Sequence, residues 1–105
     1  MMPEKETFRS VINGPKPVLV DFTASWCGPC KMMAPILEQL RASMGDALRI
    51  IKIDVDQNNA LATELEVSGV PTLILYKNGM PIWRQSGVVP IHTLQSTIQA
   101  HLQKA

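Results

Sequence analysis

The sequence contains few cysteines, few aromatic residues and almost no excess of either charge. Two cysteines in 105 residues exclude a disulfide-rich miniprotein, which carries many cysteines spread along its chain. Ten Lys and Arg against nine Asp and Glu give a net charge of +1, which argues against binding to nucleic acid or anionic membranes. Every apolar run is shorter than the ~18 residues of a membrane span, and the polar start 1–6 lacks a signal-peptide apolar segment. We therefore expect a cytoplasmic protein that contacts neither nucleic acid nor membrane.

The length and the hydrophobic content of the chain predict one folded domain. A chain of 105 residues with 46% hydrophobic residues has enough material for one core, and no internal repeat is present. We expect residues 1–105 to form a single domain, and a monomer is the default state.

Four short apolar runs rich in branched residues predict β-strands. They cover residues 17–22, 48–55, 72–76 and 80–86. Asn78-Gly79 separates the last two runs, and this dipeptide favours a tight hairpin because both residues tolerate positive φ. Helical spacing of apolar residues before, between and after the strands predicts four helices. These positions are Phe8, Val11 and Ile12; Met33, Ile36, Leu37 and Leu40; Leu61 and Leu65; and Ile91, Leu94, Ile98 and Leu102. The order predicts an α/β fold, with a parallel βαβ unit, an antiparallel closing hairpin and helices on both faces.

The two cysteines stand in the segment Cys27-Gly28-Pro29-Cys30, directly after a predicted buried strand and at the start of a helix. A helix N-terminus favours an anion, so the pKa of the Cys27 thiol should fall. The i, i+3 spacing brings the two sulfurs to one face of the first turn, within bonding reach. Such a pair can alternate between dithiol and disulfide, and redox chemistry is the favoured interpretation.

Other interpretations of the cysteine pair have less support. A structural zinc site needs four ligands, and the two histidines, His92 and His101, lie far along the chain. Haem attachment requires His directly after the second cysteine, where Lys31 stands. A structural disulfide closing so short a loop would stabilise little, and two buried cysteines can also neighbour each other by chance. We expect no metal site.

The residues around the pair resemble those of a known family. The segment from Val20 to Met32, with Trp26-Cys27-Gly28-Pro29-Cys30-Lys31 at its centre, is similar to the active-site segment of the thioredoxin family. Four further segments are similar too: Ala34-Pro35-Ile36-Leu37, Asp54-Val55-Asp56-Gln57-Asn58, Val70-Pro71-Thr72 and Lys77-Asn78-Gly79. The resemblance runs in register from about residue 17 to residue 87. It implies the thioredoxin fold, with a mixed central sheet of four to five strands, since the usual first strand is short or missing here.

The resemblance also implies roles for individual residues. Cys27 would be the nucleophile and Cys30 the buried resolving thiol. Val70-Pro71 would form a cis peptide facing the cysteines, with the Val70 backbone available to an extended substrate. The residues implied in substrate binding are Trp26, Gly28, Pro29, Gly69, Val70, Pro71 and Gly87.

Asp21 and Lys52 are the remaining candidate catalytic residues. Asp21 lies among apolar residues of the first strand, where desolvation should raise its pKa, so it could accept the proton of Cys30. Alternatively, backbone N–H groups could satisfy this carboxylate. Lys52 matches the lysine that lies near this carboxylate in the family, although a solvated strand residue is the simpler interpretation.

Packing roles are predicted for Trp83 and for three methionines. Trp83 is expected to pack in the core, whereas Trp26, beside the nucleophile, is expected at the surface. Met32, Met33 and Met44 are interpreted as helix packing residues, and not as a metal-binding cluster.

The Gly28-Pro29 dipeptide resembles the reducing branch of the family. The implied function is general protein-disulfide reduction on disulfide-containing proteins, with no bound cofactor. Electrons would come from NADPH through a partner flavoprotein, a thioredoxin reductase. A binding module that uses the same groove, and an oxidant or isomerase in an oxidising compartment, are the alternatives.

Overall fold

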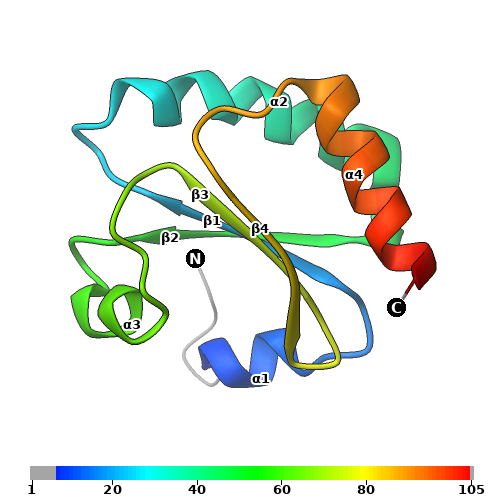
Figure 1. The fold of residues 1–105 in the computed structure, drawn as a ribbon, viewed down its shortest axis with the longest axis horizontal. Helices are drawn as coiled ribbons and strands as arrows, with labels where there is room; N and C mark the ends of the chain where they lie inside the picture. Colours follow the sequence, from blue (N-terminus) through cyan, green and yellow to red (C-terminus); the bar gives the residue numbers. More distant parts are fainter. Residues whose placement is uncertain (1–6, 105) are drawn as a thin grey trace.

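The computed structural model describes residues 7–104, which form a four-stranded sheet and its covering helices (Figure 1). The helices are α1 (Phe8–Ile12), α2 (Gly28–Met44), α3 (Asn59–Glu64) and α4 (Ile91–Lys104), with a short 3-10 turn, η1 (Gly45–Ala47). The strands are β1 (Val18–Thr23), β2 (Arg49–Asp54), β3 (Thr72–Lys77) and β4 (Met80–Ser86). The fifth strand that the family resemblance allows would precede α1 and lies outside the described residues.

The strands lie in the order β2-β1-β3-β4. β1 and β2 are parallel, with Asp21 opposite Lys52, while β3 runs antiparallel to both β1 and β4. The βαβ unit and the closing hairpin predicted from the sequence are therefore confirmed. Asn78 (φ +53°) and Gly79 (φ +80°) form the hairpin turn, and the Gly79 N–H donates to the Ile12 carbonyl at 3.0 Å, which joins the turn to α1.

The sheet separates two apolar cores. Helices α2 and α4 cover one face, and α1 and α3 cover the other (Figure 1). Strand β1 is buried on both faces, and its side chains alternate: Leu19 joins the α2/α4 core, whereas Val20 and Phe22 join the α1/α3 core. By the same alternation Asp21 points to the α2/α4 face, which places a carboxyl group inside an apolar layer.

The packing predictions for Trp83, Met33 and Met44 are confirmed, but the one for Met32 is wrong. Met33 is fully buried, and Met44 and Trp83 pack against the same core. Met32 is 62% exposed, because it lies one residue away from the α2 stripe that faces the sheet. None of the helices within residues 7–104 is long and apolar enough to cross a membrane.

Candidate active site

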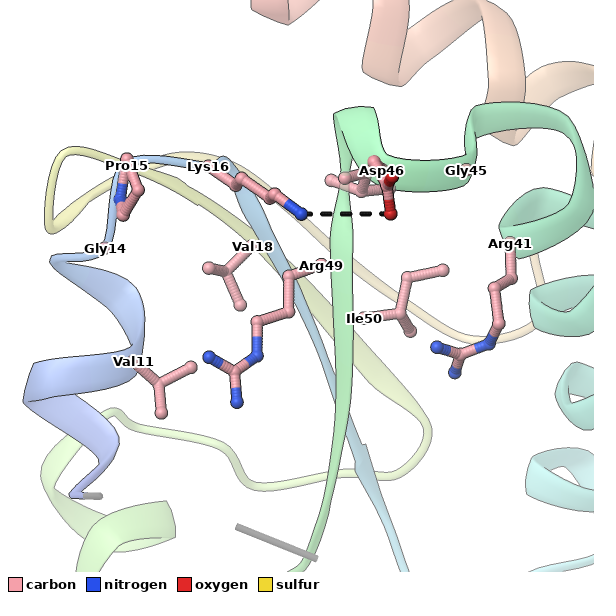
Figure 2. Close-up of a pocket in the computed structure, with 11 residues that line it drawn as sticks. Val11, Gly14, Pro15, Lys16, Val18, Arg41, Gly45, Asp46, Arg49 and Ile50 are labelled. Atoms are coloured by element: carbon pink, nitrogen blue, oxygen red, sulfur yellow. Dashed lines mark ion pairs between the residues drawn. The ribbon is translucent and has the colours of Figure 1, made fainter. Parts of the chain in front are cut away.

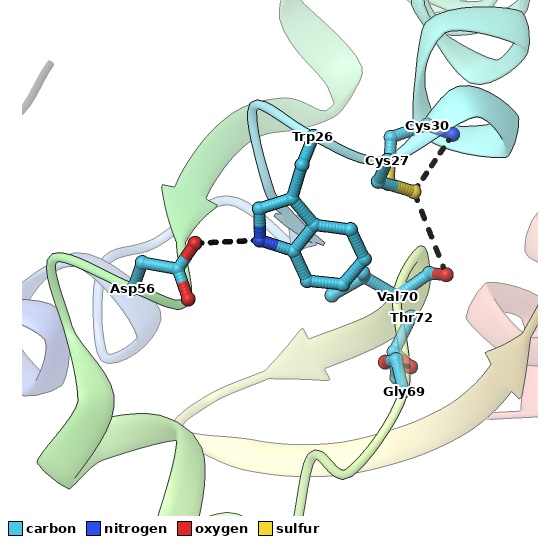
Figure 3. Close-up of a disulfide and its surroundings, with 7 residues drawn as sticks. All are labelled: Trp26, Cys27, Cys30, Asp56, Gly69, Val70 and Thr72. Carbon is cyan, nitrogen blue, oxygen red and sulfur yellow. Dashed lines mark hydrogen bonds between the residues drawn. A yellow bond between two sulfur atoms is a disulfide. The ribbon is translucent and has the colours of Figure 1, made fainter.

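The start of α2 positions the cysteine pair. Cys27 is the N-cap of α2, and its Sγ accepts a hydrogen bond from the Cys30 backbone N–H at 3.1 Å. Pro29 occupies the first turn, where helices do not need an N–H donor. The Cα atoms of Cys27 and Cys30 are 5.3 Å apart, and the two sulfurs form a disulfide (Figure 3).

Both cysteines are buried, Cys27 at 3% exposure and Cys30 at 7%. The resemblance describes only Cys30 as buried, so burial does not distinguish the two cysteines here. Their backbone positions do, because Cys27 Sγ receives the free N–H at the helix end while Cys30 lies within the first turn. Ala24 forms a small apolar cluster with the pair, and Val55 and Val70 pack against it.

The loop before β3 brings a second group of predicted residues to the disulfide. The Val70-Pro71 peptide is cis, as the resemblance implies, and the Val70 carbonyl oxygen lies 3.6 Å from Cys27 Sγ (Figure 3). Gly87 donates its N–H to the Pro71 carbonyl at 2.9 Å, in a backbone conformation (φ +89°) that favours glycine. Gly69 accepts a hydrogen bond from the Thr72 hydroxyl at 2.6 Å. Val70, which is 43 positions beyond Cys27 in the chain, thus lies against the disulfide, and Gly69 and Gly87 are hydrogen-bonded to the residues that follow Val70 in the chain.

Trp26 lies on the surface next to the disulfide. It is 70% exposed, as predicted, and its indole N–H donates to Asp56 Oδ2 at 2.8 Å (Figure 3). The Asp54 side chain accepts the N–H groups of Asp56 and Gln57, which fixes the turn that carries Asp56. The sequence analysis did not select Asp56. The sequence did contain a pattern that predicts this contact: Trp26 follows β1 and Asp56 follows β2, and neighbouring parallel strands end at the same edge of a sheet.

Exposed residues flank the cysteines and Gly87 along the chain. Gly28 and Pro29 are exposed at the start of α2, and Met32 and Val88 are exposed large apolar side chains. Three of the four exposed large apolar side chains within residues 7–104, Trp26, Met32 and Val88, thus lie near the cysteine segment or Gly87 in the chain.

Asp21 and Lys52 lie together beside α2. Asp21 is 2% exposed, and its Oδ1 has no hydrogen-bond partner, so the alternative of full satisfaction by backbone N–H groups is wrong for this atom. Desolvation raises the pKa of Asp21 from 3.8 to about 6, while the positive charge of Lys52 lowers it by a smaller amount. Both residues line a cavity of about 230 Å³ that also meets Ala34, one helical turn beyond Cys30.

Another cavity, of about 640 Å³, lies elsewhere and contains none of the predicted site residues (Figure 2). It is lined by Val18 and Arg49, the first residues of β1 and β2, whereas Cys27 follows the opposite end of β1. Across it Lys16 forms a 3.9 Å ion pair with Asp46 (Figure 2). Within residues 7–104, no group of three His, Cys, Asp or Glu side chains is arranged to hold a metal ion.

The contact between Trp26 and Asp56 gives a first testable prediction. Asp56→Ala should expose the indole N–H and speed its exchange with solvent about fivefold, because a hydrogen bond to a carboxylate contributes about 1 kcal/mol or more. NMR of the Trp26 indole proton measures this. Asp56→Asn, which keeps an acceptor oxygen, should stay close to the parent, and Asp46→Ala is the control for loss of a remote exposed carboxylate. Equal exchange in Asp56→Ala and the parent would contradict the prediction.

Cys27 caps α2, forms a disulfide with Cys30 in the first turn and packs against the loop that holds the cis Val70-Pro71 peptide. This placement of a Cys-X-X-Cys pair at a helix start defines a thiol-disulfide oxidoreductase. The family model described as thioredoxin matches residues 1–100. The chain belongs to the thioredoxin family, and its Cys27–Cys30 pair is the redox-active disulfide of a protein-disulfide oxidoreductase.

Individual relatives agree with this assignment. A thioredoxin-like protein of Synechocystis sp. is 53% identical over 82 residues, covering 77% of this chain and 78% of the relative. The thioredoxin of Bacillus subtilis is 48% identical over 85 residues, covering 81% and 82%. A bifunctional thioredoxin reductase/thioredoxin of Mycobacterium leprae is 48% identical over 80 residues, which are 76% of this chain and 18% of that protein.

Proposed function

We propose that the protein is a general protein-disulfide reductase in which Cys27 attacks and Cys30 resolves. The carrying observation is the 3.1 Å hydrogen bond from the Cys30 N–H to Cys27 Sγ at the start of α2. In the reduced protein this N–H and the helix dipole would stabilise a thiolate on Cys27, which lowers its pKa and makes it the attacking sulfur.

Two exchange steps complete the reduction. The Cys27 thiolate attacks one sulfur of the substrate disulfide, forms a mixed disulfide and releases the other substrate sulfur as a thiolate. Cys30, once deprotonated, attacks Cys27 Sγ, which breaks the mixed disulfide and releases the second substrate thiolate. Two electrons have then moved to the substrate, and the Cys27–Cys30 disulfide remains, the state seen in the structure.

The apolar surface around the disulfide would bind the substrate. An extended segment would lie against Trp26, Gly28 and Pro29 on one side and against Gly69, Val70, Pro71 and Gly87 on the other. Its backbone would pair with Val70, whose carbonyl is 3.6 Å from Cys27 Sγ. Contacts to substrate backbone and generic apolar groups suit a protein with many partners.

Asp21 would serve as the base for the resolving step. Its pKa of about 6 leaves it ionised at neutral pH yet basic enough to take a proton. The adjacent cavity meets α2 at Ala34, one turn beyond Cys30, and provides room for water between the carboxyl group and this part of the helix. Lys52 would tune this pKa through its charge.

A reductase also needs a source of electrons. The Mycobacterium leprae relative carries a thioredoxin reductase in the same chain, which supports a flavoprotein reductase fed by NADPH as the partner of this protein. No cofactor bound to the chain itself is required. The proposal requires a compartment where thiols are kept reduced, so the cytoplasm is proposed, with a single-domain monomer as the working form.

The reduction potential tests the direction of electron flow. We expect the Cys27–Cys30 pair to equilibrate with glutathione at about −270 mV, and the protein to reduce insulin when NADPH and a flavoprotein thioredoxin reductase are supplied. A potential near −120 mV, typical of an oxidising enzyme, or no insulin reduction, would overturn the assignment as a reductase.

A further inference from the structure

The loop formed by residues 65–71, called here the Val70 loop, joins α3 to β3 and carries three of the proposed substrate-binding residues, Gly69, Val70 and Pro71. One end is bound by a side chain of strand β4, and the other by a side chain of β3 that contacts β4. The position of the Val70 backbone relative to Cys27 therefore depends on side chains outside the loop.

Arg84 of β4 anchors the first end. Its guanidinium donates hydrogen bonds to the carbonyls of Leu65, at 2.7 Å, and Glu66. Glu66 has a φ of +57°, and Val67 donates its N–H back to the Ala62 carbonyl at 2.8 Å, which closes α3 and turns the chain toward Val70. A cation is favoured at this helix end, and a planar fork of donors can bind two carbonyls together.

Thr72 and Ser86 anchor the second end. These residues face each other in the β3–β4 register, and their hydroxyl oxygens are 3.0 Å apart. Thr72 Oγ1 donates to the Gly69 carbonyl at 2.6 Å. The first anchor holds Leu65 and Glu66, five and four residues before Val70, and the second holds Gly69, one residue before Val70. Arg84 supplies the anchor that involves no residue of β3.

We infer that Arg84 is a positioning residue for substrate binding: it fixes the Leu65–Glu66 end of the Val70 loop, so that the Val70 backbone is presented beside Cys27. This inference rests on the proposed function. Arg84 takes no part in the exchange of electrons or protons. Its loss should therefore weaken the binding of extended protein substrates and leave the chemistry of the disulfide unchanged.

A protein disulfide and a small disulfide distinguish weaker substrate binding from altered disulfide chemistry. A protein disulfide such as insulin needs the Val70 backbone, whereas a small aromatic disulfide such as dithiobis(nitrobenzoate) needs access to Cys27 alone. Arg84→Ala should raise KM for insulin about fivefold with kcat nearly unchanged. It should leave the rate with the small disulfide, and the equilibrium constant of the Cys27–Cys30 pair with glutathione, within about twofold of the parent.

The matched control is Arg9→Ala. Arg9 also contacts α3, through a 2.9 Å ion pair with Glu64 Oε2, but it binds an exposed side chain and not the loop carbonyls. It should change neither KM nor the small-substrate rate. Arg84→Lys keeps the charge but lacks the fork, so its KM should lie between those of the parent and Arg84→Ala.

Hydrogen exchange gives a readout independent of activity. Amides 67–70 should exchange about tenfold faster in Arg84→Ala, while amides of β1 and β3 keep the parent rates. An unchanged KM for insulin, an equal loss with both substrates, or the same change in Arg9→Ala would overturn the inference. If the parent itself fails to reduce insulin, the proposed function fails, and the exchange of amides 67–70 still decides whether Arg84 anchors the loop.

Discussion

Replacing Cys27 by Ser should lower insulin reduction on the order of a thousandfold or more, because the attacking sulfur is lost while Ser still caps α2. Replacing Cys30 by Ser should have a different outcome. Attack by Cys27 would proceed, but the mixed disulfide would not be resolved, so a covalent adduct with the substrate should accumulate. Non-reducing electrophoresis and mass spectrometry of each variant with a disulfide substrate measure this contrast.

The asymmetry between the two variants carries the test. Cys27→Ser should form almost no adduct. If its remaining Cys30 formed an adduct as fast as Cys27 does in Cys30→Ser, the assignment of Cys27 as the attacking sulfur would be wrong. The double variant addresses the binding-module alternative. If Cys27→Ser/Cys30→Ser supports the full function in cells, redox chemistry is not what the protein contributes there.

Asp21→Asn should make the folded protein more stable at neutral pH. Burial raises the pKa of Asp21 from 3.8 to about 6, so the folded state binds a proton more tightly than the unfolded state. Stability of the parent therefore falls as pH rises from about 4 through 6, and the penalty is fully present above that range. The difference in pKa corresponds to about 3 kcal/mol. Asn, which stays neutral, should avoid this cost at pH 8 and show little difference from the parent below pH 4, measured by denaturant unfolding of the oxidised proteins.

The same substitution should slow catalysis. Resolution by Cys30 should lose its base in Asp21→Asn, so insulin reduction should fall at least about tenfold at pH 7, with the first attack by Cys27 nearly unchanged. In the parent the resolving step should accelerate as pH rises through about 6. Glu38→Gln is the matched control, because Glu38 lines the same cavity and pairs with Arg41 at 3.7 Å, but at the surface. Equal rates for Asp21→Asn and the parent across neutral pH would contradict the role of Asp21 as a base.

Most of the fold was predictable because its elements depend on local patterns. The four strands are short runs of branched apolar residues, and their observed bounds differ from the predicted ones by one residue at most. The hairpin at Asn78-Gly79 follows from the positive φ that both residues tolerate. Met32 was assigned wrongly because successive helix residues point about 100° apart, which is about the width of the buried stripe. Met33 lies within that stripe, and its neighbour Met32 lies just outside it.

The sequence by itself determined the reactive pair, since Cys27 and Cys30 are neighbours in one helical turn and need no distant residue to meet. It also indicated that the pKa of Asp21 is raised, because a carboxyl group within an apolar strand is desolvated. Only the tertiary structure decided what surrounds them. The Asp56 partner of Trp26 and the bonds from Arg84 to the Val70 loop join residues 18 to 30 positions apart, and the Val70 carbonyl beside Cys27 was anticipated only through the family resemblance. Such contacts depend on strand order and register, which the sheet as a whole sets and no local pattern encodes.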